Sequence, residues 1–262
     1  MTGAATGSLL DRLTRDGAAA DLGPDPAEPD AAADAAPGGA AAAAGAADAA
    51  RLVAAVRRAA AAMPDEAAAC VAWDEAGAAH TPETLDVALA ELTGWRFLGF
   101  TRAAAKRRIR DAARLAMQRT RSVGALQLAA AFVGELGDED DVAALERVAV
   151  HPRLTLHGAT ALSNLRPWQA RLALLRLLTT TTGDARVLVI DRLLPHVGQP
   201  AVRLALVRDA LRGLAPEHAH EVARDIASAC RAKDLADDKG VADDVREGAR
   251  AVLAAAEDAA NA

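Results

Sequence analysis

Alanine supplies more than a quarter of this 262-residue chain, whereas aromatic residues make up only 2% of it and tyrosine is absent. Alanine and leucine are the strongest helix formers, and the β-branched and aromatic residues that favour strands are scarce. A hydrophobic content of 52% with 25% charged residues is typical of a globular protein. The sequence therefore predicts an all-α protein whose core is thin and aliphatic.

Proline and glycine divide the chain from Asp48 onward into helical segments of about 12 to 20 residues. Pro64, Pro82, Pro200 and Pro216 each stand where a first helical turn would begin, a position at which the missing N–H of proline costs little. The predicted helices are residues 48–62, 65–77, 82–95, 100–119, 122–136, 139–149, 153–164, 167–180, 184–195, 200–213, 216–233 and 241–259.

Pairs of apolar helical faces recur about every 30 residues in the middle of the chain. One helix ends in Ala-Phe-Val-Gly-Glu-Leu-Gly-Asp, the next carries Val142 and Leu145, and Ala-Thr-Ala-Leu (159–162) follows the turn at His151-Pro152. Over roughly residues 122–214 this pattern resembles HEAT-like repeats, in which paired helices stack into an α-solenoid. The intra-repeat turn departs from the family, with His151-Pro152-Arg153 where Asp followed by Arg is common.

This resemblance implies an α-α superhelix of stacked antiparallel helical hairpins, with a concave surface that holds a partner. It carries over no catalytic residue. The predicted divisions are an Ala-rich helical region with a basic helix (48–121), HEAT-like helical repeats (122–235) and a C-terminal capping helix (236–262).

Residues 1–47 are expected to form a disordered leader rich in Ala, Pro and Asp, in which Leu22 is the one large apolar residue beyond Gly17. Such a segment buries too little apolar surface to offset its chain entropy. The short amphipathic stretch from Leu9 to Leu13 has two interpretations: an element that docks on a partner, or a frayed terminus, which is favoured.

Charge is unevenly distributed along the chain. Residues 1–50 contain eight acids and two arginines, a net charge of −6 that equals the net charge of the whole chain. Residues 51–262 are electrically balanced. A neutral folded part argues against dominant non-specific nucleic-acid binding.

The sequence also bears on the compartment. The N-terminus lacks the basic and apolar regions of a secretory signal, and the alanine run at 40–47 is too short to span a bilayer. Cys70 and Cys230 lie in apolar helical patterns, which suits buried thiols in a reducing compartment. We expect a cytoplasmic protein without membrane association, and the high Ala and Arg usage is typical of a GC-rich bacterial genome.

The most unusual local feature is residues 96–121, which hold nine Arg or Lys and one acid, a net charge of +8. Helical spacing places Lys106, Arg110 and Arg114 on one stripe at the border between solvent and the core face. This stripe could hold a phosphate, an acidic peptide or the acidic leader. The favoured alternative is a solvated face balanced by acids on adjacent helices, such as Glu135, Glu139, Asp140 and Asp141.

A second arginine series follows the later repeats: Arg171, Arg176, Arg192, Arg203, Arg208 and Arg212. Some HEAT-like proteins are DNA glycosylases with a basic concave face, aromatic residues and an essential acid. Here Trp95 and Trp168 could stack on bases, and Asp191 or Asp209 could be the acid. A neutral fold with three Trp and no Tyr is poor in both features that nucleic-acid binding needs.

No cofactor or metal is predicted. The chain contains no Gly-x-Gly-x-x-Gly, P-loop or Gly-x-Ser-x-Gly motif. His218 and Glu221 could share a helix face, but a metal site needs three or four ligands, and polar residues of a first helical turn are the simpler interpretation. His151 and His157 are expected to be turn and surface residues.

The leading hypothesis is a non-catalytic scaffold that binds another protein or an acidic peptide along one face of the stack, with a nucleic-acid-processing protein as the alternative. A third hypothesis is that the leader covers the basic segment. The oligomeric state does not follow from the sequence. The candidate partner-binding residues are Lys106, Arg107, Arg110, Arg114, Arg121, Trp168 and Arg171.

Overall fold

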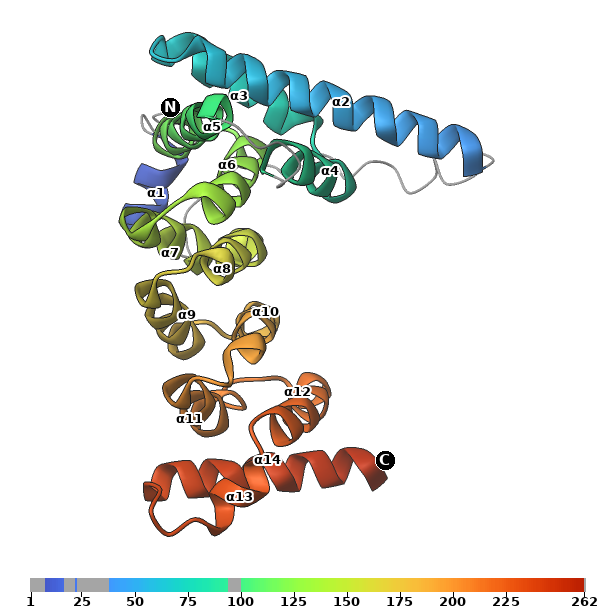
Figure 1. Ribbon diagram of the computed structural model, residues 1–262. Coiled ribbons are helices and arrows are strands. Elements are labelled where there is room, and N and C mark those ends of the chain that lie inside the picture. Colours follow the sequence, from blue (N-terminus) through green and yellow to red (C-terminus); the bar gives the residue numbers. More distant parts are fainter. Residues whose placement is uncertain (1–7, 17–21, 23–37, 94–99, 262) are drawn as a thin grey trace, which may run out of the picture.

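The structure is a computed structural model that describes residues 8–16, 22, 38–93 and 100–261 (Figure 1). These residues form helices and contain no strand, which confirms the all-α prediction.

The N-terminal helices are α1 (Leu9–Asp16), α2 (Gly38–Ala62), α3 (Glu66–Ala79), α4 (Pro82–Thr93) and α5 (Phe100–Arg119). The middle of the chain forms α6 (Val123–Leu136), α7 (Val142–Val150), α8 (Thr155–Asn164), α9 (Trp168–Thr180) and α10 (Gly183–Leu193). The C-terminal helices are α11 (Pro200–Asp209), α12 (Pro216–Ala229), α13 (Ala232–Asp237) and α14 (Asp243–Asn261). Three 3-10 turns join them: η3 (Glu139–Asp141), η4 (Pro152–Leu154) and η5 (Leu194–His196).

Local sequence signals explain most helix boundaries. The carboxylate of Asp65 and the hydroxyl of Ser122 accept hydrogen bonds from backbone N–H groups in the first turns of α3 and α6. Pro200 and Pro216 occupy the first positions of α11 and α12. The predicted ranges agree with these helices to within a few residues, except at 48–62, where α2 already begins at Gly38, and at 216–233. There Arg231 adopts a left-handed φ of 52° and separates α12 from α13, although no glycine or proline marks the break.

The structure differs from the expected frayed terminus at residues 9–16, because they form α1 and bury Leu9, Leu10 and Leu13. The predicted leader also overlaps α2, which begins at Gly38. The rest of that leader lies outside the described residues, apart from Leu22, which is buried.

The helices stack as antiparallel hairpins in two columns (Figure 1). The hairpin partners are α5 with α6, α7 with α8, α9 with α10 and α11 with α12. One column contains α6, α8, α10 and α12, and the other contains α7, α9 and α11. The helices α2 and α14 lie across the two ends of the stack. One hydrophobic core runs through the molecule from Leu9 to Val252, so it continues across the predicted divisions at 121 and 235.

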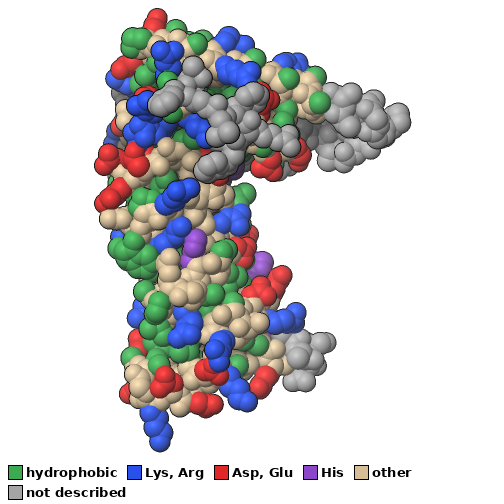
Figure 2. All heavy atoms as spheres, viewed as in Figure 1, with side chains coloured by type: hydrophobic (Ala, Val, Ile, Leu, Met, Phe, Trp, Pro, Cys, Tyr) green, Lys and Arg blue, Asp and Glu red, His purple; other side chains and the backbone are tan. Residues whose placement is uncertain are grey.

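The outline of the molecule is hollowed on the side of α8, α10 and α12 (Figure 2). On the opposite edge, hydrophobic side chains gather at the height of α9, where Trp168 is 41% exposed and Leu172 is 37% exposed. The stack therefore offers two contrasting surfaces, a hollow side and an edge with an apolar group.

Small residues let neighbouring helices approach one another closely. At the crossing of α3 and α6, a Cβ on Gly77 would lie 2.3 Å from the backbone nitrogen of Ala125, and a Cβ on Gly124 would lie 2.3 Å from the carbonyl oxygen of Gly77. At the crossing of α6 and α8, a Cβ on Gly134 would lie 2.6 Å from the Cα of Ala161. An alanine-rich sequence thus fills its core by bringing backbones together rather than by inserting large side chains.

The same principle holds elsewhere in the stack. Within the hairpin of α7 and α8, a Cβ on Gly158 would lie 2.6 Å from the backbone nitrogen of Ala149. At the C-terminal end, a Cβ on Gly248 of α14 would lie 2.5 Å from the carbonyl oxygen of Val207 in α11. Close crossings of this kind therefore occur in the part of the stack from α3 to α8 and again between α11 and α14.

One of the few large aromatic residues reinforces the first crossing. The fully buried Trp73 of α3 donates its indole N–H to the carbonyl oxygen of Ala125 at 3.1 Å. Its ring meets Phe132 of α6 edge to face, with centroids 5.8 Å apart. Trp73 is thus a core anchor, and it joins the N-terminal helices to the stacked hairpins.

We predict that Gly77→Ala destabilises the protein by about 3 kcal/mol, because the new Cβ would collide with backbone atoms that cannot move independently. The matched control is Gly45→Ala in α2, where a Cβ would meet nothing within 4 Å. That change should stabilise the protein by up to about 1 kcal/mol through higher helix propensity. Urea denaturation measures both, and equal effects at the two sites would contradict the close crossing.

Candidate functional site

The basic helix α5 supplies most of the predicted binding residues. Lys106, Arg110 and Arg114 are each half-buried, which confirms that their stripe follows the border between solvent and core. Arg107 is exposed, and its Nε donates to the carbonyl oxygen of Ala103 within the same helix. Arg121 is exposed in the connection between α5 and α6. The helix therefore presents two kinds of cation, some half-buried and some open to solvent.

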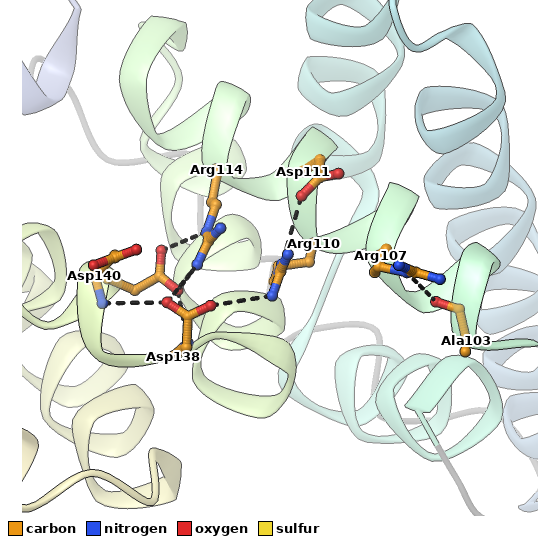
Figure 3. A network of polar contacts seen from close by, with 8 residues as sticks. Ala103, Arg107, Arg110, Asp111, Arg114, Asp138 and Asp140 are labelled. Carbon is orange, nitrogen blue, oxygen red and sulfur yellow. Dashed lines mark hydrogen bonds and ion pairs between the residues drawn. The ribbon is translucent and has the colours of Figure 1, made fainter.

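Arg114 is engaged by two carboxylates on the turn that precedes α7 (Figure 3). Its Nε and Nη2 donate to the two carboxylate oxygens of Asp141, each at 2.7 Å, and Nη2 also donates to Asp138 at 2.8 Å. Arg110 donates to the other oxygen of Asp138 at 3.1 Å. The bidentate contact with Asp141 is the strong form of an arginine–carboxylate pair.

The carboxylates are held in place by their own backbone. Asp138 and Asp141 form a reciprocal capping box around η3, and the N–H of Asp138 donates to Asp141 at 2.9 Å. The hydrogen bonds that Arg114 donates to Asp141 raise the pKa of its guanidinium group. Burial alone would raise the pKa of Asp138, but the hydrogen bonds and charge of Arg114 bring that pKa below its ordinary value.

These contacts correspond to the alternative in which acids on adjacent helices balance the stripe. That alternative names Asp141 as one of the balancing acids, but it does not name Asp138. Its capping-box position, three residues before Asp141, is the signal that could have identified it. Arg110 and Arg114 therefore fasten α5 to the start of the next hairpin, and they are not open to a partner.

Arg108 of α5 borders a groove against α2. The groove has a volume of about 370 Å³, and its lining residues are Arg57, Ala60, Ala61, Ala104, Ala105, Arg108 and Ile109. Arg108 is exposed, and Arg57 donates to Glu91 at 2.7 Å in a pair whose side chains are both largely exposed. This apolar floor with an arginine rim is the candidate partner-binding site. Arg107, one of the predicted binding residues, neighbours Arg108 in the chain and does not line the groove, whereas Arg108 and the wall that α2 provides were not predicted.

The prediction that Arg171 contacts a partner does not hold. Arg171 is buried, and its Nη1 donates to the carbonyl oxygens of Leu162, at 3.1 Å, and of Leu165 at the end of α8. Arg186 has the same role, because it donates to the carbonyl oxygens of Thr181, Asp209 and Ala210 at the ends of α9 and α11. Burial lowers the pKa of both arginines. These guanidinium groups satisfy helix-end carbonyls inside the stack.

Other members of the second arginine series also bond within the fold. Arg176 forms a bidentate pair with Glu146 of α7 at 2.7 and 2.6 Å. The Nε of Arg192 donates to the hydroxyl of Thr160 at 2.8 Å. Most of the series is thus paired within the fold, although the side chains of Arg176 and Arg212 stay largely exposed.

The residues of the glycosylase alternative are spread apart. Asp209 is buried and paired with Arg208 and Arg212. Asp191 lies in the last turn of α10, whereas the carbonyl of Asp209 is bonded to Arg186 near the first turn of that helix. Trp168 is exposed, and Trp95 lies outside the described residues.

The histidines do not form a metal site. In the described part of the chain no group of three or more His, Cys, Asp or Glu could hold a metal ion. His218 instead lies 2.9 Å from the Asp184 carboxylate. His151 lies in the turn between α7 and η4, as expected, and it is buried there. Burial, with repulsion from His80, lowers the pKa of the half-buried His157 to about 4, so His157 is not the surface residue that was expected.

Both cysteines are free thiols. Cys230 is fully buried, and burial raises its pKa to about 11. Burial also raises the pKa of the partly buried Cys70. Neither thiol is thus activated as a nucleophile.

None of the helices in the described ranges is long and apolar enough to cross a membrane.

We predict that Asp141→Asn destabilises the protein by about 2 to 3 kcal/mol, because it leaves the half-buried Arg114 without its main carboxylate. The matched control is Glu146→Gln, which weakens a pair whose arginine is 57% exposed and should cost less than about 1 kcal/mol. Urea denaturation at neutral pH compares them. A smaller loss for Asp141→Asn than for the control would rule out the fastening role of Arg114.

Compared with known proteins, the chain matches no protein-family model and has no significant match among curated proteins or solved structures.

Proposed function

We propose that this protein is a non-catalytic interaction scaffold that binds an acidic segment of another protein in the groove between α2 and α5. The observation that carries this proposal is the arginine-rimmed, alanine-floored groove itself. The small alanine side chains on the floor of the groove let the backbone of a bound helix approach closely. Exposed guanidinium groups at its rim form bidentate hydrogen bonds with carboxylates.

The charge distribution on α5 supports an acidic ligand. Arg110 and Arg114 are already neutralised by Asp138 and Asp141, whereas Arg107 and Arg108 on the same helix are exposed. Both side chains of the Arg57–Glu91 pair are largely exposed, so the pair contributes little to stability. A carboxylate of the ligand can therefore replace Glu91 as the partner of Arg57.

The architecture supports a scaffold. Stacked hairpins present an extended surface, and the hollow on the side of α8, α10 and α12 gives the outline such a surface (Figure 2). We take the hairpins to be HEAT-like repeats, in which pairs of short helices connect through turns such as η4. The two free thiols suit a reducing, cytoplasmic setting.

We predict that Arg107→Glu/Arg108→Glu weakens capture of the partner at least about tenfold, because charge reversal repels an acidic ligand. The matched control is Lys233→Glu/Lys239→Glu, which reverses two exposed charges at the other end of the stack. Each tagged protein is used for capture from native lysate with chemical cross-linking, and both protein and nucleic acid are identified in the eluate.

A protein that cross-links to α2 or α5 through an acidic segment, and that only the Arg107→Glu/Arg108→Glu variant loses, is the expected result. Nucleic acid captured by wild type and lost on charge reversal would instead favour the nucleic-acid-processing alternative. Equal capture by all three proteins would exclude this groove as the binding site.

A further inference from the structure

Helix α1 differs from every other helix of the stack in how it joins the fold. It has eight residues and lies against both α5 and α7, between them in Figure 1. The neighbouring helices α7, α9 and α11 pack directly on one another, but α5 and α7 are not in extensive contact except through α1. A seam is therefore open between these two helices, and α1 fills it.

The walls of this seam are set without α1. Arg110 and Arg114 tie α5 to Asp138 and Asp141, directly before α7. The hairpin partners α6 and α8 also pack against each other through the close contact of Gly134 with Ala161. The groove between α5 and α7 thus keeps its shape when α1 leaves it.

The side chains of α1 have the pattern of a helix bound in a groove. Leu9, Leu10 and Leu13 are 0%, 7% and 3% exposed, whereas Asp11, Thr14 and Arg15 point to solvent. Three apolar anchors on one face with a polar opposite face are the usual signature of helix-in-groove recognition. The leucines supply the contact area of this site.

The polar contacts of α1 are largely its own. The hydroxyl of Ser8 accepts from the N–H of Asp11, and the carboxylate of Asp11 accepts from the N–H of Ser8, each at 3.1 Å. These hydrogen bonds form a reciprocal cap at the start of α1. Towards α5, the N–H of Leu9 donates to the carbonyl oxygen of Thr120 at 2.9 Å, and the charge of Arg119 acts on Asp11.

The connection to the rest of the chain is long. Residues 17–37 separate α1 from α2, whereas the hairpins of the stack are closed by short turns. A tether of this length holds a ligand near its site at an effective concentration on the order of millimolar. A segment bound in this way competes with any free ligand for the same groove.

We propose that the groove between α5 and α7 is a second binding site, that its ligand is a short amphipathic helix of a partner protein, and that α1 is its built-in competitor. The partner helix carries the pattern of α1: a serine cap, two adjacent leucines, an acid and a leucine three residues after the second. The serine and the acid form the cap that starts such a helix, and the open seam selects the leucines. This site does not rest on the proposed groove between α2 and α5.

The test uses the full-length protein and a fluorescein-labelled synthetic peptide of residues 7–17. In the variant Leu9→Asp/Leu13→Asp, α1 is expected to leave the groove, because two charged side chains cannot be buried there. The peptide should then bind this variant at least about tenfold more tightly than wild type, in which the tethered α1 competes. Arg15→Gln, on the solvent face, is the matched control and should bind like wild type.

A variant that keeps its circular dichroism and melting transition but fails to bind the peptide would overturn the proposal. A peptide that carries the same two Leu→Asp changes should not bind any form of the protein, and its binding would also overturn the proposal. If light scattering shows that the wild-type protein forms dimers by exchange of α1, the ligand of the groove is α1 of a second copy of this chain. The proposal of a different partner protein would then be wrong.

Hydrogen exchange on the wild type provides a measurement that does not depend on how the variant folds. If α1 is a replaceable ligand, its amides exchange through local opening, at least about a hundredfold faster than the core amides of α6. Exchange of α1 only together with α6 would show that it is a fixed part of the stack and would contradict the proposal.

Discussion

The close approach of helix backbones at glycine and alanine is the constraint on which the rest of this structure depends. A chain with so few aromatic residues cannot fill wide gaps between helices, so its helices pack at short distances from one another. Gly77 against Ala125, and Gly134 against Ala161, set the distance between successive layers. Because each layer positions the next, the grooves on the surface of the stack take their shape from these contacts.

Arginine has a second structural role in this fold, as a fastener between layers. Arg171 and Arg186 satisfy helix-end carbonyls in the interior, and Arg114 joins α5 to the capping box before α7. Many of the arginine charges in the described residues are therefore used within the fold. Arg110 and Arg114 are paired with carboxylates of the fold, whereas Arg107 and Arg108 are exposed. The exposed arginines are therefore the better candidates for contact with a partner.

The sequence predicted the helices well and the contacts between them poorly, for physical reasons. Helix boundaries follow local signals, such as the serine cap at Ser122 and the proline at the start of α11. The pairing of Arg114 with Asp138 joins residues on different hairpins and depends on how these pack, which periodicity does not specify. The helix α1 is too short to be stable alone, so its sequence favoured a frayed end. Its leucines become buried only because α5 and α7 leave a seam for them.

The N-terminal helices and the hairpins that follow them form one stack, joined at the crossing of α3 and α6. The most direct measurement is the hydrogen-exchange rate of the indole N–H of Trp73, followed by NMR and assigned with Trp73→Phe. This N–H is buried and bonded to Ala125 across the crossing, so it should exchange only with global unfolding and belong to the slowest class in the protein. Rapid exchange of this proton while the amides of α6 stay protected would show that α3 separates from α6. The N-terminal helices and the later hairpins would then not form one stack.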